Sequence, residues 1–330
     1  MTKEYRRLAM YDVAGIGSAL LDFTFQVDED ILEELGLKKG QMHLIDEDKS
    51  RDIQARMKNF PVEITPGGSA ANTMAGVANL GGRSLFIGKV GRDAHGRIYI
   101  DESRKAGVEM RVNLHDKMTG HAITFITPDS ERTFATHLGA ALHFGREDVS
   151  ADAIRSSKIL HIEGYMLEGA LKEASVFAME LAREAGVLIS LDLADPALIQ
   201  RNHAELTRLV ADYADIVLVN EDEAKAFTGL EGERALHEIH SRCRVAVVKL
   251  GESGSLIKSE QGVHCVQPYI TEVVNTNGAG DMYAAGILFS LASGISLEKA
   301  GRISSYAASL VVGQVGARLK NRIDLSLLGD

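Results

Sequence analysis

Short apolar runs alternate with helical patterns along most of this 330-residue chain. The runs are rich in Val, Ile and Leu and are bounded by turn residues, so we predict strands over 11–16, 84–88, 158–162, 187–191, 215–219, 245–250 and 270–274. Between the runs the periodicity is helical, and we predict helices over 69–80, 97–106, 168–185, 221–227, 232–241, 281–293 and 297–313. This alternation predicts an α/β fold in which helices sandwich a mostly parallel sheet. Ligands of such folds bind beyond the carboxyl ends of the strands.

Two stretches interrupt the alternation. The first predicts strands over 21–27 and 42–45 with a helix over 28–37 between them. The second predicts a hairpin of 121–127 and 131–137 around Pro128-Asp129-Ser130. These strands lack a covering helix of their own, so we expect a small second sheet. We interpret it as a lid, formed by about residues 18–65 and 113–138, within a single domain that covers residues 1–330.

The net charge of -10 and the pI near 5.6 argue against nucleic acid and anionic membranes as partners, because no basic field would attract them. Cys243 and Cys265 have no metal-binding spacing and form no disulfide framework, which fits a cytoplasmic location. Residues 1–10 lack the apolar core of a signal peptide. His237 and His240 share a helix face, but nothing near them in sequence completes a metal site.

A glycine turn precedes the predicted helix 281–293, in the sequence Asn277-Gly278-Ala279-Gly280-Asp281. The backbone N–H groups of such a turn point at one place, and the helix start adds partial positive charge there, so the turn can hold a phosphate. Asp281 would repel that phosphate unless it had another task, such as taking a proton from an attacking hydroxyl. The alternative is that Asp281 only caps the helix.

Two other glycine pairs lie near predicted strand ends. Gly15-Ile16-Gly17 is not a dinucleotide-binding motif, because Leu20 occupies the place of the third glycine and a strand follows instead of a helix. Asp22 lies just beyond, where its carboxylate can accept hydrogen bonds from two sugar hydroxyls or can simply be solvated. Gly67-Gly68 opens a helix of small residues that carries Asn72. That pair allows close helix packing, and it also allows a ligand to approach the backbone.

Polar residues follow two further predicted strands. Asn220 and Glu223 have the spacing of a capping box, and they also suit Mg²⁺ held through water. Lys249 and Gly251 suit a hairpin, and they also leave room for a nucleotide beside the backbone. In the predicted lid hairpin, Arg132 is either a surface residue or a side chain that reaches a phosphate when the lid closes.

Taken together and in this order, these residues resemble the ribokinase-like (PfkB) family of carbohydrate and nucleoside kinases over essentially the whole chain. Gly67-Gly68 with Asn72 is similar to the family's N-terminal signature, and Asn275 to Asp281 is similar to its C-terminal signature. Asn220 with Glu223 is similar to its Asn-x-x-Glu motif. The stretches Glu131-Arg132-Thr133-Phe134 and Gly40-Gln41-Met42-His43 resemble adenosine-kinase-like members.

The resemblance implies a role for each matched position. Asp281 would deprotonate the acceptor hydroxyl, and Gly278, Ala279 and Gly280 would hold the transferred phosphoryl group. The implied acceptor-binding residues are Asp22, Gly67, Gly68 and Asn72, with Arg132 steadying phosphate. The implied nucleotide-binding residues are Asn220, Lys249, Gly251 and Asn277, with Asn220 and Glu223 organising Mg²⁺ through water. ATP and Mg²⁺ are the expected cofactors.

One position departs from the family pattern. Where the signature usually begins with an aspartate that helps to bind a monovalent cation, this chain has Asn275, so a K⁺ requirement becomes doubtful. The resemblance also leaves both a monomer and a homodimer open.

The leading hypothesis is an ATP-dependent kinase of a nucleoside such as adenosine, acting on the ribosyl 5'-hydroxyl. The alternatives are a kinase of a free sugar, ribose or fructose, and a non-catalytic nucleoside or nucleotide sensor. An NAD-dependent dehydrogenase is disfavoured by the failed glycine motif. A purine would need an apolar slot, and the candidates for it, which are also candidates for the lid core, are Phe23, Phe25, Phe134 and Leu138.

Overall fold

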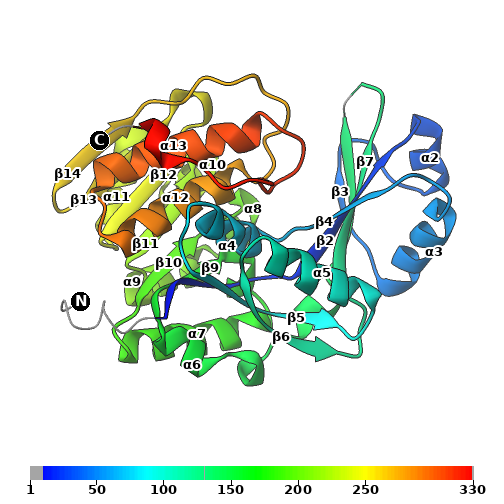
Figure 1. The fold of residues 1–330 in the computed structure, drawn as a ribbon, viewed down its shortest axis with the longest axis horizontal. Helices are drawn as coiled ribbons and strands as arrows, with labels where there is room; N and C mark the ends of the chain where they lie inside the picture. Colours follow the sequence, from blue (N-terminus) through cyan, green and yellow to red (C-terminus); the bar gives the residue numbers. More distant parts are fainter. Residues whose placement is uncertain (1–9, 130, 329–330) are drawn as a thin grey trace.

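A nine-stranded sheet forms the centre of the protein (Figure 1), in a computed structural model that describes residues 10–129 and 131–328. The N-terminal segment 1–9 and the predicted hairpin residue Ser130 lie outside the described residues. The sheet order is β14-β13-β12-β11-β10-β9-β1-β5-β6. The strands are β1 Tyr11–Ile16, β5 Ser84–Gly91, β6 Glu109–His115, β9 Ser157–Glu163, β10 Leu188–Asp192, β11 Ile216–Asn220, β12 Val245–Lys249, β13 Ser255–Ser259 and β14 Gly262–Val266.

Seven neighbouring strands of this sheet, β12-β11-β10-β9-β1-β5-β6, are parallel. The β13–β14 hairpin at one edge adds antiparallel pairs. Apart from the edge strand β6, the parallel strands are apolar and largely buried, and β5 is buried along its whole length. Such strands need helices on both faces of the sheet. The predicted α/β class with a mostly parallel sheet is therefore confirmed.

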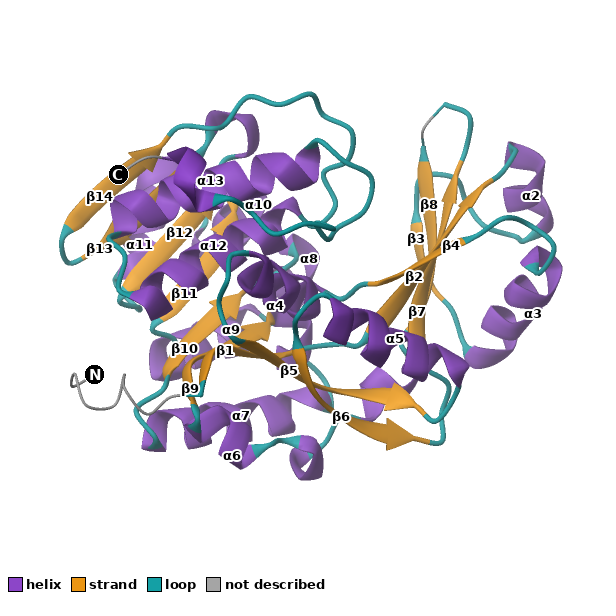
Figure 2. Cartoon of the chain, viewed as in Figure 1, coloured by secondary structure: helices purple, strands orange, loops and turns teal. Residues whose placement is uncertain are grey.

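Two layers of helices supply that cover (Figure 2) and form two hydrophobic clusters, one for each face. One face carries α4 Ser69–Asn79, α5 Ala94–Lys105, α12 Ala279–Ser293 and α13 Leu297–Val312. The other face carries α6 Ala151–Arg155, α7 Leu171–Glu184, α8 Pro196–Arg201, α9 His203–Tyr213, α10 Glu221–Thr228 and α11 Gly232–His240. Short 3-10 helices are η1 Gly139–His143, η2 Arg146–Asp148, η3 Gly164–Leu167, η4 Gly251–Ser253 and η5 Leu325–Leu328.

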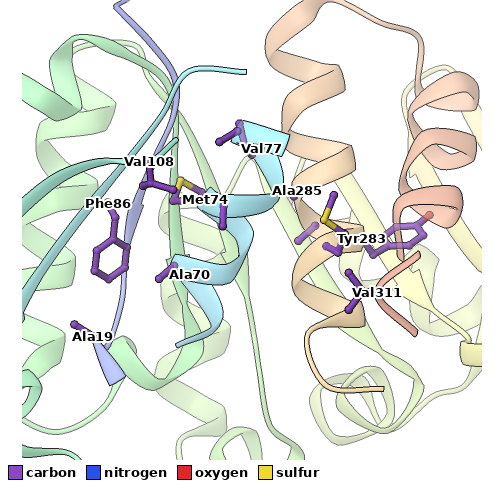
Figure 3. Packing of buried hydrophobic residues seen from close by; sticks show 14 of the residues in the cluster. Ala19, Ala70, Met74, Val77, Phe86, Val108, Tyr283, Ala285 and Val311 are labelled. Carbon is purple, nitrogen blue, oxygen red and sulfur yellow. The ribbon is translucent and has the colours of Figure 1, made fainter. Parts of the chain in front are cut away.

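Helix α4 packs against β1 and β5 of the sheet and lies beside α12, and it is buried from Ala70 to Asn79 (Figure 3). Met74 packs over Gly15 of β1, while Ala285 of α12 packs on Gly76 of α4. Because most residues of α4 are small, two helices and the sheet can approach closely there. The first turn of α4 is thereby held next to the first turn of α12, which matters for the site.

A second, five-stranded sheet stands apart from the large one, in the order β3-β8-β7-β2-β4, as Figures 1 and 2 show. Its strands are β2 Leu20–Gln26, β3 Met42–Leu44, β4 Glu63–Pro66, β7 Gly120–Ile126 and β8 Arg132–His137. The outer face is covered by α2 Glu29–Glu34 and α3 Glu47–Met57. Along β2, Phe23 and Phe25 are buried, whereas Asp22 and Thr24 face the cleft. The predicted small second sheet is confirmed.

The predicted boundaries of the small sheet differ from the structure at one end. Residues 113–115 belong to β6, because β6 pairs with β5 as far as His115 opposite Gly91. The next strand of the small sheet, β7, begins only at Gly120. The second predicted segment therefore begins too early.

The predicted strand 270–274 is wrong, because this stretch is a loop between β14 and α12. Ile270 and Val273 are exposed, and the adjoining sheet edge is already occupied by β13 and β14, which the sequence analysis missed together with β4 and β6. Helix α12 also begins earlier than predicted, at Ala279, so Asp281 lies inside its first turn. Within residues 10–129 and 131–328, no helix is long and apolar enough to cross a membrane.

Candidate active site

Four neighbouring parallel strands each end in a polar residue: Glu163 on β9, Asp192 on β10, Asn220 on β11 and Lys249 on β12. Register places these ends along one edge, with Asp192 opposite Glu163 and Asn220 opposite Lys249. The sequence analysis named Asn220 and Lys249 but missed Glu163 and Asp192. Both missed residues directly follow predicted strands, so the same argument would have found them.

A cleft of about 550 Å³ separates this edge from the inner face of the small sheet. Most of the site residues expected from the sequence line it, although they come from distant parts of the chain. They are Asp22, Gly68, Asn72, Arg132, Asn220, Glu223, Lys249, Gly251, Asn277, Gly278, Gly280 and Asp281. The two other expected residues, Gly67 and Ala279, do not line the cleft.

Asp281 is half-buried at the wall of the cleft, and α4 supplies both of its side-chain partners. Ser69 Oγ donates to one carboxylate oxygen at 2.7 Å, and Asn72 Nδ2 donates to the other at 2.9 Å. Burial raises the pKa of Asp281 above its usual value, although both of these hydrogen bonds oppose the shift. The carboxylate is therefore oriented, open to the cleft and made more basic.

The glycine turn beside Asp281 has the backbone shape that an anion site needs. Gly278 has φ 80° and is the N-cap of α12, and a Cβ there would lie 2.6 Å from Ala317. A Cβ on Gly280 would meet only Lys249 Nζ, at 3.4 Å, so this side of the turn is open. The N–H of Ala279 donates to the Thr276 carbonyl at 3.2 Å, which holds the turn. The first turn of a 15-residue helix thus faces the cleft next to a lysine.

The glycine pair before α4 brings Asp22 against the backbone. A Cβ on Gly67 would lie 2.5 Å from Asp22 Oδ2, and Gly68, with φ 87°, would place a Cβ 2.2 Å from the Ser18 carbonyl. Only glycine fits either position. Burial raises the pKa of Asp22 to about 6, opposed by Arg318 and reinforced by Asp281.

Arg318 follows α13 and was missed by the sequence analysis. Its guanidinium donates to the side chain of Asn72 and to the carbonyl of Gly67, the first glycine of the pair before α4. No local pattern singles it out, because its partners lie more than 200 residues away in the chain.

Asn220 and Glu223 form a complete capping box. Asn220 Oδ1 accepts from the N–H of Glu223 at 2.8 Å, and Glu223 accepts from the N–H of Asn220 at 2.8 Å. Burial and then Asp192 raise the pKa of Glu223 to about 7. Lys249 donates to Asp192 at 3.0 Å, and although burial opposes its charge, Asp192 and Glu223 raise its pKa.

A Mg²⁺ ion at this place would need oxygen ligands, or oxygen atoms that hold its water molecules. In the described part of the chain, no cluster of three or more His, Cys, Asp or Glu side chains could hold a metal ion directly. The carboxylate of Glu223 nonetheless keeps acceptor capacity for water beyond its capping contacts.

The residues do not fit the monovalent cation that the resemblance implies. Asn275 is buried and uncharged, and its Oδ1 already accepts from Asn277 N at 2.9 Å and from Arg132 Nη1 at 2.8 Å. The guanidinium therefore already places a positive charge at that oxygen. Arg132, on β8 of the small sheet, thus contacts the segment that leads into the glycine turn before Asp281.

The candidates for a purine slot divide between the two faces of the small sheet. Phe23 and Phe25 are buried on the outer face, where Phe25 stacks on Phe125 with ring centroids 5.9 Å apart, so of the two alternatives these residues belong to the core of the small sheet. Leu138 lies at the start of η1 and does not line the cleft. Phe134 does line it, together with Ala122 and Ile126. The alternation along each strand decides this division.

Residues 35–324 match the pfkB family carbohydrate kinases. The structure is similar to that of adenosine kinase from Sinorhizobium meliloti, with a TM-score of 0.85, 38% identity and coverage of 95% of this chain and 97% of that one. It is also similar to a probable sugar kinase from Rhizobium etli CFN 42, with a TM-score of 0.86, 33% identity and coverage of 95% and 96%. A 5-dehydro-2-deoxygluconokinase from Listeria monocytogenes serotype 4a (strain HCC23) is 31% identical over 283 residues, which are 80% of this chain and 87% of that protein. The chain therefore belongs to the pfkB family of carbohydrate kinases and is an ATP-dependent carbohydrate or nucleoside kinase.

Proposed function

We propose that this kinase phosphorylates the ribosyl 5'-hydroxyl of a nucleoside such as adenosine. The observation that carries the proposal is the inner face of the small sheet, where an apolar strip lies beside a carboxylate. Ala122, Ile126 and Phe134 form the strip, and Asp22 is the carboxylate. A flat base can pack on Phe134, while Asp22 accepts hydrogen bonds from two ribose hydroxyls. The 38% identity to an adenosine kinase supports this assignment.

The charge of the cleft favours a neutral acceptor. Its lining contains more acidic than basic side chains, and one of the cations, Lys249, is paired with Asp192. The acidic residues are Asp22, Glu63, Asp192, Glu223 and Asp281, and the basic ones are Arg132 and Lys249. An acceptor that carries its own carboxylate would meet like charge there. A neutral free sugar, such as ribose or fructose, remains the second candidate, because Thr24, Thr65 and Thr124 also offer hydroxyl groups to the cleft.

In the proposed reaction, Asp281 takes the proton of the acceptor hydroxyl. That oxygen forms a bond to the γ-phosphorus of ATP, and the bond from the phosphorus to the bridging oxygen of ADP breaks. Gly278 and Gly280 hold the transferred group at the start of α12, with Lys249 beside them. Asn220, Gly251 and Asn277 face the nucleotide. Mg²⁺, when bound, would neutralise phosphate charge, with its water molecules held by Asn220 and Glu223.

The small sheet acts as a lid in this proposal, over residues 18–65 and from 116 to 138. A kinase must keep water from the transferred phosphoryl group, and closure over the acceptor achieves this. The contact from Arg132 to Asn275 supports the idea, since it links the lid to the anion-binding turn at 2.8 Å.

The test is an ADP-release assay with ATP and adenosine, inosine, guanosine, ribose or fructose as acceptor. We expect at least one nucleoside to give a higher kcat/KM than either sugar. The Phe134→Ala variant should raise KM for that nucleoside about 3- to 10-fold, as expected for loss of an aromatic contact, and should leave KM for ATP unchanged. Phe25→Ala is the matched control, because Phe25 lies on the outer face of the same sheet.

Two results would contradict the proposal. Ribose or fructose could prove the best acceptor, which would favour the free-sugar alternative. Phe25→Ala and Phe134→Ala could also raise KM equally, which would remove the argument for a base-binding strip.

A further inference from the structure

Arg318 is a cation that lies against the glycine pair Gly67-Gly68 and the first turn of α4. Its Nε donates to Asn72 Oδ1 at 2.8 Å, one terminal nitrogen donates to Ser103 Oγ at 3.1 Å, and the other donates to the carbonyl of Gly67 at 3.3 Å. All three donor groups of the planar fork are thus used, on three different elements. A planar guanidinium with three hydrogen-bonded nitrogen atoms is held in one orientation, whereas the single ammonium group of a lysine would be free to rotate.

The contact with Asn72 continues to Asp281. Asn72 accepts from Arg318 with its oxygen and donates to Asp281 Oδ2 with its nitrogen at 2.9 Å. A flipped amide would turn its NH₂ group toward the guanidinium and its oxygen toward the carboxylate. Both contacts would then be repulsive, so Arg318 decides which way the Asn72 amide points.

The charge of Arg318 also acts on the two carboxylates of the cleft. Arg318 opposes the rise that burial imposes on the pKa of Asp22. Burial lowers the pKa of Arg318 itself, while Tyr99, Asp22 and Asp281 oppose that change. The other charged or titratable groups that act on Asp281, or on the groups around it, are Asp192, Lys249 and Glu163.

The loop that carries Arg318 is anchored away from the cleft. Asn79 Nδ2 donates to the carbonyl of Leu319 at 3.1 Å, and the carbonyl of Asn79 accepts from Ile323 N at 3.1 Å. Gln314 Nε2 donates to the carbonyl of Arg318 at 2.9 Å. The neighbouring Ala317 packs on Gly278 of the anion-binding turn. The loop therefore sets the position of the guanidinium relative to both halves of the site.

We propose that Arg318 is a positioning residue for phosphoryl transfer. It orients the Asn72 amide against Asp281 and keeps Asp22 and Asp281 in their charged forms while they are enclosed by the protein and the acceptor. This inference rests on the proposed function, in which Asp281 is the base and Asp22 binds the acceptor. Arg318 itself does not line the cleft.

Two variants separate its charge from its geometry. Arg318→Met removes the charge and keeps most of the stem, so the acid limb of kcat/KM for the acceptor should move up by about one pH unit, and KM for the acceptor should rise about tenfold. KM for ATP should change less than about twofold. Arg318→Lys keeps the charge but loses the fork, so kcat should fall while the acid limb stays in place. The loss in Arg318→Met should also be smaller at about pH 9 than at about pH 6.

Asn79→Ala is the control for a purely structural effect, because it loosens the same loop without contacting the acceptor side. We expect its acid limb to match that of the wild type. The proposal would be overturned if Arg318→Met lowered kcat/KM for the acceptor by the same factor at every pH and raised KM for acceptor and ATP alike. An Arg318→Lys variant with wild-type kcat would also overturn it, because the fork would then be unnecessary.

A measurement without turnover separates this inference from the proposed function. Carbon-13 NMR of labelled aspartate, assigned with Asp22→Asn, should show the Asp22 carboxyl titrating at higher pH in Arg318→Met than in the wild type. Identical titration would overturn the inference. If the wild type phosphorylates no nucleoside, the proposed function fails, while this titration still decides whether Arg318 acts on Asp22. Should Arg318→Met not fold, the Arg318→Lys kinetics carry the test.

Discussion

Replacing Asp281 by Asn should remove proton abstraction while leaving the shape of the site almost unchanged. The side chains have nearly the same size, and Asp281 has one donor on each oxygen, Ser69 Oγ at 2.7 Å and Asn72 Nδ2 at 2.9 Å. An asparagine amide can keep its oxygen toward Asn72 and turn its nitrogen toward Ser69, whose hydroxyl can rotate to accept. One hydrogen bond thus weakens, at a cost of about 1 kcal/mol in the free energy of unfolding.

The effect on turnover should be much larger. A general base contributes about 10²- to 10⁴-fold, which corresponds to about 3 to 5 kcal/mol in the activation barrier. The loss of kcat therefore exceeds what a weakened hydrogen bond explains. KM for the acceptor should change little, because Asp22 and Asn72 hold the acceptor in this proposal.

The assay is steady-state ADP release with the best acceptor, together with calorimetric binding of that acceptor and thermal unfolding of both proteins. Ser69→Ala is the matched control, since it removes one partner of the carboxylate but keeps the carboxylate, and it should lower kcat less than about tenfold. If Asp281→Asn retains kcat within about tenfold of the wild type, or if both variants lose the same factor, Asp281 is not the base.

Three further predictions follow from other parts of the site. Gly278→Ala should lower kcat at least tenfold. Gly229→Ala is its control, because Gly229 has a similar φ of 71° but nothing within 4 Å of an added Cβ, so this variant should lose only about 1 kcal/mol of stability and keep its kcat. Equal kcat for the two variants would contradict this prediction. Burial raises the pKa of Glu163 to about 7, so the native state holds more protons than the unfolded state between about pH 4.5 and 7, and stability from this group falls as pH rises through that window. The unfolding free energy of the wild type relative to Glu163→Gln should therefore drop by up to about 3 kcal/mol from pH 5 to pH 8 in denaturant titrations, and a rise would reverse the sign of the argument. Replacing K⁺ by choline should leave kcat within about twofold in the wild type, because Arg132 already occupies Asn275 Oδ1, and a steep K⁺ dependence would refute that interpretation.

The parallel strands were predictable because each is a short apolar run with a burial requirement on both faces. Strands β9 to β12 lie within about one residue of their predicted ranges, and the polar residues that end β10, β11 and β12 line the cleft. The same composition misled the prediction at 270–274. That segment is as apolar as a strand, but the adjacent sheet edge is taken by a hairpin formed from β13 and β14. Competition for an edge is a non-local effect that a run of apolar residues does not reveal.

The purine-slot residues show a second limit. Phe23, Phe25 and Phe134 look alike in sequence, yet register places only Phe134 on the inner face of the small sheet. One residue of shift would exchange the two faces. The alternation of apolar and polar residues along each strand could be predicted from the sequence, whereas the sequence did not show which face of the sheet meets the cleft.

The order of strands and helices, the glycine turn before Asp281 and the glycine pair before Asn72 were readable from the chain alone, because each depends on neighbouring residues. Tertiary structure decided how they combine. It brought α4 against α12 so that Ser69 and Asn72 orient Asp281, and it folded the C-terminal loop back to place Arg318 under both. The physical reason is that these contacts depend on packing between segments about 200 to 250 residues apart, and packing of this kind leaves no periodicity in the sequence.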